Sequence, residues 1–300
     1  MSYADARNHA ALIERTDRAV TRLFGRDPLR MIQGLVTNDV AGAPVDSPVY
    51  SAFLNPKGKM IGDARVMRRA NNEVWIEADR AALDSIEAHL KKSVPPLFAR
   101  AERLNDVRVI GVYGPHSQDV KIASEMQMAT SYTGDAGADF IVVGDVEMPA
   151  LPSLTWDELE TLRIEAGSPR WGAELTEDVI PLEAGLRAAA ISETKGCYTG
   201  QEVIIRILHR GHVNRHLRGL LLGDGEIAED REIRNSDQKV VGKVTSTTRS
   251  PLLQQNIALA YVRREVAPGE TVAAGGVNAT VVELPFSKSE HEGIRRVRSA

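Results

Sequence analysis

The chain has 300 residues, of which 43% are hydrophobic, and its 37 Lys+Arg against 41 Asp+Glu give a formal net charge of −4. This length suggests about two domains, each able to bury a substantial core, and the net charge provides no global attraction to nucleic acid or anionic lipid. The single cysteine excludes an internal disulfide, a Cys₄ zinc site and an iron–sulfur cluster held by four thiolates of this chain.

The cellular setting follows from the same composition. A chain with one cysteine is typical of a reducing cytosol. Near the N-terminus, Asp5, Arg7, Glu14 and Arg15 interrupt the apolar stretch that a signal peptide needs. No run of ~18 apolar residues offers a transmembrane helix. We therefore expect a soluble, cytoplasmic protein with no membrane partner.

Residues 1–100 alternate between strand and helix patterns. In chain order the sequence predicts a strand over Asp17 to Phe24, a helix begun by Asp27-Pro28, a hairpin of Pro48 to Leu54 and Lys59 to Arg68, a strand over Glu73 to Ala78 and a helix from Asp79 to Lys92. The hairpin turn Asn55-Pro56-Lys57-Gly58 combines a proline with preset φ and a glycine that accepts positive φ. In the last helix Leu83, Ile86 and Leu90 recur at helical spacing, so we expect it to cover a sheet face.

Residues 101–216 follow a similar pattern. The sequence predicts a strand over Val107 to Val112, a helix over Pro115 to Gln127, a strand over Phe140 to Val143 and a helix over Trp156 to Ala166. Mixed strands with helices on one side indicate an α+β sandwich of the split-βαβ type.

From about Leu217 the pattern changes to short strand-like runs separated by glycines, with no convincing helix, which predicts a small β-barrel. The predicted strands are Leu217 to Leu222, Lys239 to Thr247, Ile257 to Arg263 and Val277 to Leu284. We therefore expect an α+β fold class. Its α+β region would span residues 1–216, as two split-βαβ lobes of roughly 1–100 and 101–216, and the C-terminal β-barrel would span 217–286. The charged tail 287–300 has little to bury, and we expect it to be flexible.

The only thiol lies in the octapeptide Lys195-Gly196-Cys197-Tyr198-Thr199-Gly200-Gln201-Glu202. The glycines allow a tight turn and the approach of another molecule to the sulfur, and Lys195 would favour the thiolate over the thiol. These features make Cys197 and Lys195 candidate catalytic residues. A free cysteine is also among the most buried residue types and usually packs as a small hydrophobe, so both interpretations stay open.

The segment Arg206 to Arg218 is dense in arginine and histidine. It could bind an anion such as the phosphate backbone of a tRNA, although a solvated edge strand is the simpler interpretation of a charge run. Its three histidines would bind a metal only if one helix aligned them. Gly211 and the preceding run Val203-Ile204-Ile205 argue against that helix, so we expect no metal site.

Two carboxylates lie between apolar residues and a glycine. They are Glu165 in Arg163-Ile164-Glu165-Ala166-Gly167 and Glu183 in Pro181-Leu182-Glu183-Ala184-Gly185-Leu186. A carboxylate in such a setting can face a pocket and accept two hydrogen bonds from a planar amidine edge, such as that of a pterin. Each could equally be a structural ion pair or a helix cap.

The thiol octapeptide resembles the signature of the YgfZ family, the folate-binding relatives of the glycine-cleavage T-protein that help to maintain iron–sulfur enzymes. The resemblance spans nearly the whole chain, and the octapeptide is its most specific part. Four further segments support it: Gln33 to Val40, Lys57 to Met60, Ile164 to Gly167 and Leu284 to Ser287.

This resemblance implies a cloverleaf of two α+β lobes and a C-terminal barrel that encloses a tetrahydrofolate cavity. It implies that Glu165 and Glu183 face the pterin and that Arg215 lies near the glutamate end of the folate. Tyr198 and Gln201 of the octapeptide are further candidate folate contacts. Cys197 is the thiol that the YgfZ motif supplies and that T-proteins lack.

The T-protein reaction itself needs a carboxylate near the folate nitrogen to help an amine leave from a lipoyl-bound aminomethyl group. Asp84 is the candidate from an ungapped match, although its neighbours fit an exposed helix face better. Arg18 stands where the family has a tryptophan near the first strand, which predicts different pterin stacking. The segments around Glu165 and Glu183 are nevertheless closer to T-proteins than those of most YgfZ members.

These observations give a preferred hypothesis and two alternatives. The preferred one is a tetrahydrofolate-binding protein that uses Cys197 in the assembly or repair of iron–sulfur clusters on client enzymes, some of which modify tRNA. The first alternative is a folate-dependent aminomethyltransferase of the T-protein type, so the sequence does not decide whether the protein is an enzyme. The second is an RNA-associated protein that binds through Arg206 to Arg218.

Overall fold

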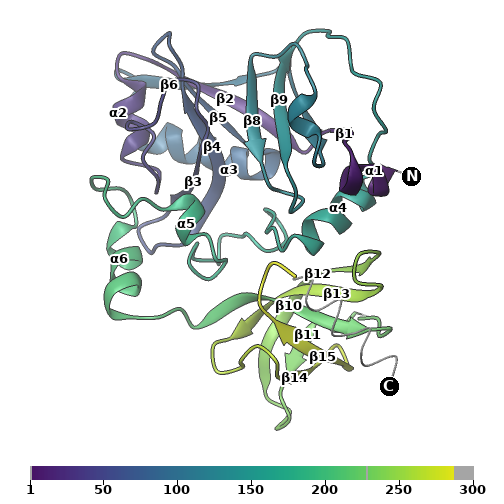
Figure 1. Cartoon of the computed structure of the whole chain (residues 1–300). Coiled ribbons are helices and arrows are strands. Elements are labelled where there is room, and N and C mark those ends of the chain that lie inside the picture. The colour runs from purple at the N-terminus through teal and green to yellow at the C-terminus, as the bar shows by residue number, and fades with distance from the viewer. Residues whose placement is uncertain (1, 228, 287–300) are drawn as a thin grey trace.

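The structure is a computed structural model that describes residues 2–227 and 229–286. Figure 1 shows two sheets next to each other in the upper part of the view and a barrel beneath them. Mixed α+β sheets followed by a closed barrel confirm the predicted fold class. The charged tail expected over 287–300 lies outside the described residues.

The first sheet has five antiparallel strands in the order β3-β4-β5-β2-β6. Its strands are β2 (Arg18–Gly25), β3 (Val49–Leu54), β4 (Met60–Arg68), β5 (Val74–Asp79) and β6 (Ala99–Leu104), and its helices are α2 (Pro28–Gln33) and α3 (Arg80–Ser93). Because β2 lies between β5 and β6, the β5-α3-β6 unit is a split βαβ. The sequence predicts this type of lobe but not the strand β6.

Local sequence signals fix several of these boundaries. The Asp79 side chain accepts a hydrogen bond from the Ala81 backbone N–H and so caps α3. Leu83, Ile86 and Leu90 are buried against the sheet, which is the face predicted from their spacing. In the β3-β4 turn, Gly58 has φ +75°, a conformation that favours glycine.

The second sheet has four antiparallel strands in the order β1-β7-β9-β8. They are β1 (Ala11–Glu14), β7 (Val107–Tyr113), β8 (Met126–Thr130) and β9 (Gly137–Val143), and α1 (Ser2–Asn8) precedes them. The helix predicted over Pro115 to Gln127 is wrong, because the segment forms one 3₁₀ turn (η1, Ser117–Asp119) and then enters β8. Buried Met126 and Met128 alternate with exposed Gln127, which is the period of a strand.

The two sheets pack face to face. Val20, Met67 and Trp75 of the first sheet form one buried cluster with residues of the second, which are Val109, Met126, Met128 and Ile141. Strand β2 of the first sheet lies against β7 of the second. This interface holds the polar cavity described below.

The chain then runs through α4 (Trp156–Glu165), α5 (Arg187–Ala190) and α6 (Gln201–Arg210). Thr155 and Glu158 form a capping box at the start of α4. The sequence argued against a single helix that would align His209, His212 and His216, and α6 indeed ends at Arg210. The run Val203 to Ile205 nevertheless lies within α6. Tertiary packing overrides the low helix propensity of these β-branched residues, since Ile204 is fully buried in the core beneath α6.

The barrel closes in the order β10-β13-β12-β11-β14-β15, with β15 pairing back onto β10. Its strands are β10 (Arg215–Gly223), β11 (Glu232–Arg234), β12 (Val240–Ser250), β13 (Gln255–Arg263), β14 (Thr271–Ala274) and β15 (Val277–Val282). The sequence predicts the four longer strands and misses β11 and β14, which are too short for a recognisable alternation. Strand β10 is continuous across position 217, so the exact domain borders stay a prediction.

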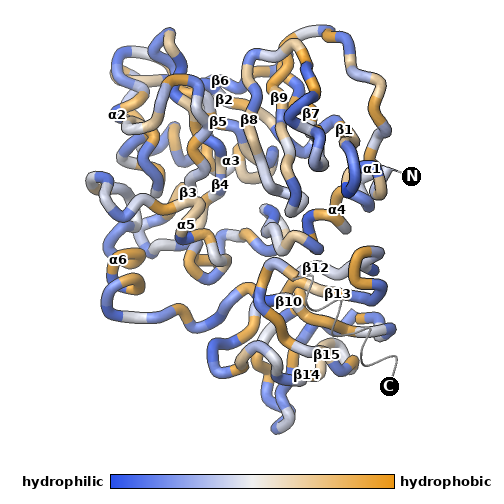
Figure 2. Tube along the Cα trace, viewed as in Figure 1, coloured by the Kyte–Doolittle hydropathy of each residue, from blue (hydrophilic) through white to orange (hydrophobic). Residues whose placement is uncertain are grey.

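In Figure 2 hydrophobic segments lie along the strands of both sheets and on α6. Within residues 2–227 and 229–286, no helix has the length and apolar character needed to cross a membrane.

Candidate functional site

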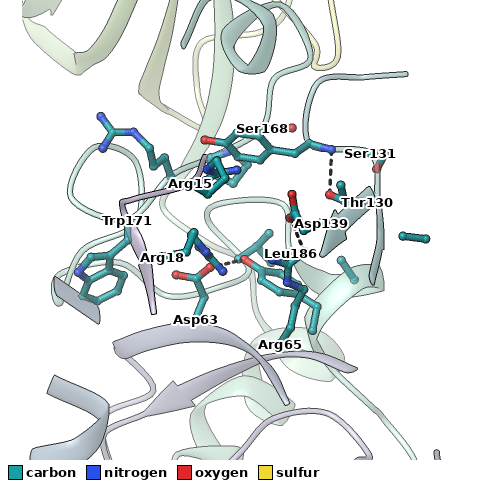
Figure 3. Close-up of a pocket in the computed structure, with 16 residues that line it drawn as sticks. Arg15, Arg18, Asp63, Arg65, Thr130, Ser131, Asp139, Ser168, Trp171 and Leu186 are labelled. Carbon is teal, nitrogen blue, oxygen red and sulfur yellow. Dashed lines mark hydrogen bonds and ion pairs between the residues drawn. The ribbon is translucent and has the colours of Figure 1, made fainter. Parts of the chain in front are cut away.

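A cavity of about 540 Å³ lies where the two sheets meet (Figure 3). Its walls come from β2, β3 and β4 of the first sheet, from β8 and β9 of the second, from the segment between α4 and α5, and from α5 itself. The residues that line it are Arg15, Arg18, Tyr50, Asp63, Arg65, Ala129, Thr130, Ser131, Tyr132, Asp139, Ser168, Pro169, Arg170, Trp171, Leu186 and Ala189. The cavity therefore combines aromatic rings, arginines and two carboxylates.

Asp63 on β4 is the carboxyl group of this cavity that is best placed to transfer a proton. Its side chain is buried, and the Tyr50 hydroxyl donates a hydrogen bond to Oδ2 at 3.0 Å. Oδ1 is also buried and has no hydrogen-bond partner among the described residues. Burial raises the pKa of Asp63 above its usual value, although the nearby Arg18 guanidinium opposes this shift. An acid with one free, buried oxygen can hold or release a proton at the cavity wall.

Arg18 and Arg65 are held by a single carboxylate behind the cavity. Glu77, which is fully buried, accepts hydrogen bonds from Arg18 Nε at 2.6 Å, from Arg18 Nη2 at 2.8 Å and from Arg65 Nε at 2.7 Å. The two guanidinium groups hold the pKa of Glu77 well below its usual range. Because the arginines are fixed from behind, their remaining N–H groups are preorganised at the cavity wall.

The same network continues into the second sheet. Arg65 Nη1 donates to Asp139 Oδ2 at 2.6 Å, and the Tyr113 hydroxyl donates to Asp139 Oδ1 at 2.7 Å. Arg15 donates to the Tyr113 oxygen at 2.7 Å. The phenol oxygen lies so close to Gly111 that a Cβ there would be 2.5 Å away. This buried chain of charge-assisted bonds links the two sheets around the cavity.

The opposite wall, Ser168 to Trp171, is anchored to the barrel. Arg163 of α4 is fully buried and donates to Glu174 at 2.7 Å and to Ser246 at 2.7 Å. Glu174 also accepts from the hydroxyls of Ser246 and Thr245 on β12, at 2.6 and 2.7 Å. The segment that carries Arg170 and Trp171 thus cannot move without breaking a buried ion pair.

Glu165 lies away from this lining. Its Oε2 accepts hydrogen bonds from the Tyr3 hydroxyl at 2.6 Å and from Arg7 at 2.5 Å, while Oε1 accepts from the Ser250 hydroxyl and the Leu252 backbone N–H. Both oxygens thus join α1 and α4 to the barrel, which is the structural alternative noted for this residue. A folate contact by Glu165 stays a prediction.

Glu183 and Arg215 lie together, also outside the cavity lining. Arg215 Nη2 donates to Glu183 Oε2 at 3.1 Å, and its guanidinium lies 4.6 Å from the centre of the Tyr261 ring. The Leu217 backbone N–H donates to the Glu183 carbonyl. These contacts tie the start of β10 to the segment before α5, and the predicted folate contacts of both residues remain untested.

The thiol octapeptide spans the turn before α6 and the first two residues of that helix. Cys197 is exposed. The Lys195 ammonium donates to the carbonyls of Gln33, Val36 and Asn38 at 2.6–2.9 Å. Burial lowers the pKa of Lys195 to about 8, and the charge of the Asp39 carboxylate opposes this shift. Lys195 therefore joins the turn by hydrogen bonds to the end of α2 and to the segment that follows it.

Tyr198 and Gln201, the two candidate folate contacts of the octapeptide, lie outside the cavity. Tyr198 is buried, its hydroxyl has no hydrogen-bond partner among the described residues, and burial raises its pKa to about 12. Gln201 is half-buried as the first residue of α6. Neither lines the cavity, so their predicted folate contacts stay predictions.

The segment Arg206 to Arg218 does not form one continuous surface element. Its first part is the end of α6, and its last part is the start of β10. His209 lies on the helix and His216 on the strand, so one helix does not align them. No cluster of His, Cys, Asp or Glu in the described part of the chain could hold a metal ion.

Asp84 lies on the exposed face of α3, with its side chain 70% exposed and paired with Arg103 at 2.7 Å. The structure thus puts Asp63, and not Asp84, in the cavity. Trp156 is 44% exposed on α4, whereas Trp171 lines the cavity. The signal for Asp63 was its place in the strand run Met60 to Arg68, where an acidic residue interrupts apolar neighbours.

Comparisons with known proteins agree with this architecture. Residues 2–133 match the family model of the GCVT N-terminal domain. Residues 215–288 match the family model of the glycine cleavage T-protein C-terminal barrel domain. Among curated relatives, the aminomethyltransferase of Nostoc sp. is 28% identical and that of Moorella thermoacetica 29% identical. The matches cover 96% and 93% of this chain and 87% of each relative.

Among solved structures, the glycine cleavage system aminomethyltransferase T from Bartonella henselae has a TM-score of 0.81 at 20% sequence identity. The match covers 96% of this chain and 89% of that one, and it shows a shared fold. The two matched domains together cover more than half of the chain. The chain therefore contains both of these domains and fits the GCVT-like family.

Proposed function

We propose that this protein is a tetrahydrofolate-dependent one-carbon transferase of the aminomethyltransferase type. The observation that carries the proposal is the buried Asp63 carboxyl, which has a raised pKa and one unpartnered oxygen in a cavity between the sheets. The relatives named aminomethyltransferase, which match nearly the whole length of the chain, support the same activity.

The cavity residues fit a folate. A volume of about 540 Å³ suits a ligand of this size class. The Trp171 and Tyr132 rings line the cavity and offer apolar surface on which a pterin ring can stack. Arg170, whose side chain is 40% exposed, can pair with a carboxylate of the glutamate tail. These residues replace Glu165, Glu183 and Arg215 as our first candidates for folate contacts.

Bound tetrahydrofolate would supply the nitrogen that accepts the one-carbon unit. The protein's part is to hold a proton at Asp63 Oδ1, the oxygen left free by the Tyr50 hydrogen bond, and to deliver it to the departing amine. The raised pKa keeps this carboxyl protonated to a higher pH than an exposed aspartate. The Arg18 and Arg65 guanidiniums, fixed by Glu77, stabilise the carboxylate that results.

The test is a transfer assay with tetrahydrofolate and an aminomethyl-lipoyl carrier, in which methylene-tetrahydrofolate is measured. We expect turnover by the natural protein and a loss of about 10²–10⁴-fold in Asp63→Asn, the range for removal of a general acid. Asp84→Asn is the matched control, because this carboxylate is exposed on α3, and it should keep full activity. No product with a competent carrier, or full activity in Asp63→Asn, contradicts the proposal.

A second candidate function uses the Cys197 thiol. The exposure of Cys197, and the open space around a Cβ added at Gly196, are compatible with its use in iron–sulfur maintenance on client enzymes, the role that the YgfZ resemblance implies. Cys197→Ala should then fold and bind folate but fail to restore client activity in cells that lack the protein. Full restoration of client activity by Cys197→Ala would show that the function does not need the thiol. If Asp63→Asn loses its activity while Cys197→Ala restores client activity, the transferase is favoured.

Contact with tRNA through Arg206 to Arg218 stays a separate prediction. If these cations bind a phosphate backbone, the affinity for tRNA must fall as salt is raised from 50 to 200 mM. Binding that is absent, or that does not change with salt, contradicts this contact.

A further inference from the structure

The cavity wall at residues 168–171 belongs to a short loop that closes on itself. The Arg170 carbonyl accepts hydrogen bonds from the backbone N–H groups of Glu174 and Leu175, at 3.1 and 3.0 Å. Arg170 and Trp171 both line the cavity, and Figure 3 shows the Trp171 ring at its wall. A contact that fixes Glu174 therefore also fixes the two side chains that this loop presents to the cavity.

The barrel holds this loop through Glu174. The Glu174 side chain is fully buried, and its Oε1 accepts hydrogen bonds from the hydroxyls of Thr245 and Ser246 on β12, at 2.7 and 2.6 Å. Its Oε2 accepts from Arg163 Nη1 of α4 at 2.7 Å. The Tyr261 hydroxyl of β13 donates to the Glu174 carbonyl at 3.0 Å. One residue thus joins the cavity wall to α4 and to two strands of the barrel.

A β-bulge in β12 directs both hydroxyls to Glu174. The pairing of β12 with β13 shifts by one residue between Val244 and Ser246, so Thr245 is an extra residue in the strand. Val244 lies in the barrel core, whereas Ser246 donates to Glu174 outside the barrel. In a regular strand these two residues would share a face. The bulge therefore turns Ser246 outward to join Thr245, and re-aiming a side chain is a recurrent use of bulges beside functional sites.

We propose that Glu174 is a positioning residue for folate binding, through which the barrel holds Arg170 and Trp171 in the cavity wall. The assignment rests on the proposed function, in which these two side chains contact the folate. Glu174 acts from behind the wall, because it does not itself line the cavity. Without the hydroxyls of β12, its carboxylate would keep only Arg163 and the Arg170 backbone N–H as partners.

The test removes hydroxyls at two places on one strand. The double variant Thr245→Val/Ser246→Ala takes both donors away from Glu174 Oε1. Both are changed because the single Thr245 hydroxyl proton can also reach the Leu259 carbonyl, at 2.9 Å. Thr248→Val is the matched control, since this hydroxyl on β12 lies 2.8 Å from a threonine hydroxyl of α4 and not against the loop. These variants leave the buried ion pair of Glu174 in place, so they threaten folding less than Glu174→Gln does.

Calorimetric titration of the full-length protein with tetrahydrofolate measures the effect. We expect the double variant to weaken binding about 2–30-fold, the range for residues that couple a site to a distant element. Thr248→Val, and Thr245→Ser, which keeps its hydroxyl, should bind as the natural protein does. In the transfer assay the double variant should raise KM and keep kcat, because Asp63 on the opposite wall is untouched. Natural affinity in the double variant, or an equal loss in Thr248→Val, overturns the proposal.

Amide hydrogen exchange separates this proposal from the proposed function. Without folate, the amides of residues 170–175 should exchange faster in the double variant than in Thr248→Val, because the loop has lost bonds to the barrel. Equal exchange in the two variants, or a uniform rise over the whole barrel, overturns the proposal whatever the transfer assay shows. If the natural protein does not bind tetrahydrofolate, the proposed function fails, and the exchange rates alone decide whether β12 holds this wall.

Discussion

The buried carboxylate Glu77 should be one of the strongest single determinants of stability in the two-sheet region. It is fully buried and accepts three hydrogen bonds from two guanidiniums. Glu77→Gln keeps the volume but leaves Arg18 and Arg65 without their shared counter-charge. Breaking a buried pair by removing one partner costs about 3–5 kcal/mol. At about 2–4 °C per kcal/mol, this corresponds to a fall in Tm of roughly 6–20 °C.

The matched control is Glu102→Gln on β6. Glu102 accepts two hydrogen bonds from Arg22, at 2.8 and 3.1 Å, but its side chain is 53% exposed. Water and salt screen this pair, so its loss should cost about 0–1 kcal/mol. Thermal denaturation followed by circular dichroism compares the two variants. If Glu77→Gln melts within about 1 °C of Glu102→Gln, the buried network does not stabilise the fold as we infer.

The pH dependence of the Glu77 effect has a defined sign. The folded-state pKa of Glu77 is lowered, so its stabilisation is present above the unfolded pKa of about 4.3 and is lost as the pH falls through the folded value. The difference in Tm between the natural protein and Glu77→Gln should therefore be full at pH 7 and shrink below about pH 4. A difference that grows on acidification contradicts the lowered pKa.

Three further predictions test individual contacts. Tyr50→Phe removes a hydrogen bond that lowers the pKa of Asp63. The pKa of Asp63 should therefore rise, and the high-pH limb of the pH profile of kcat should move to higher pH. A limb that does not move would exclude Asp63 as the general acid. Lys195→Ala leaves three carbonyls unpartnered and should lower the stability by about 1–3 kcal/mol in urea denaturation, whereas a neutral result would show that water replaces the ammonium. Glu165→Gln should lower Tm without changing folate affinity, and a loss of affinity of about 5–150-fold at unchanged Tm would restore it as a pterin contact.

The amino-acid sequence was enough to predict the fold class and most of the long elements. Local signals explain this success, because the Asp79 cap, the turn at Gly58 and the spacing of Leu83, Ile86 and Leu90 act within a few residues of each other. Where local preference and tertiary packing disagree, prediction failed. The segment Pro115 to Gln127, predicted as a helix, forms one 3₁₀ turn and then enters a strand that pairs with β9.

Which charged residues form the candidate site depends on the packing of the two sheets and could not be predicted from local sequence. Asp63, Arg18 and Trp171 are far apart in the chain and meet only because two sheets and the segment after α4 converge on one cavity. Glu165 has the local sequence of a pocket residue, yet its oxygens are used by Tyr3, Arg7 and Ser250, which lie up to 162 positions away. The pKa and availability of a carboxylate depend on burial and on partners brought by folding, and a sequence pattern of a few residues does not contain them.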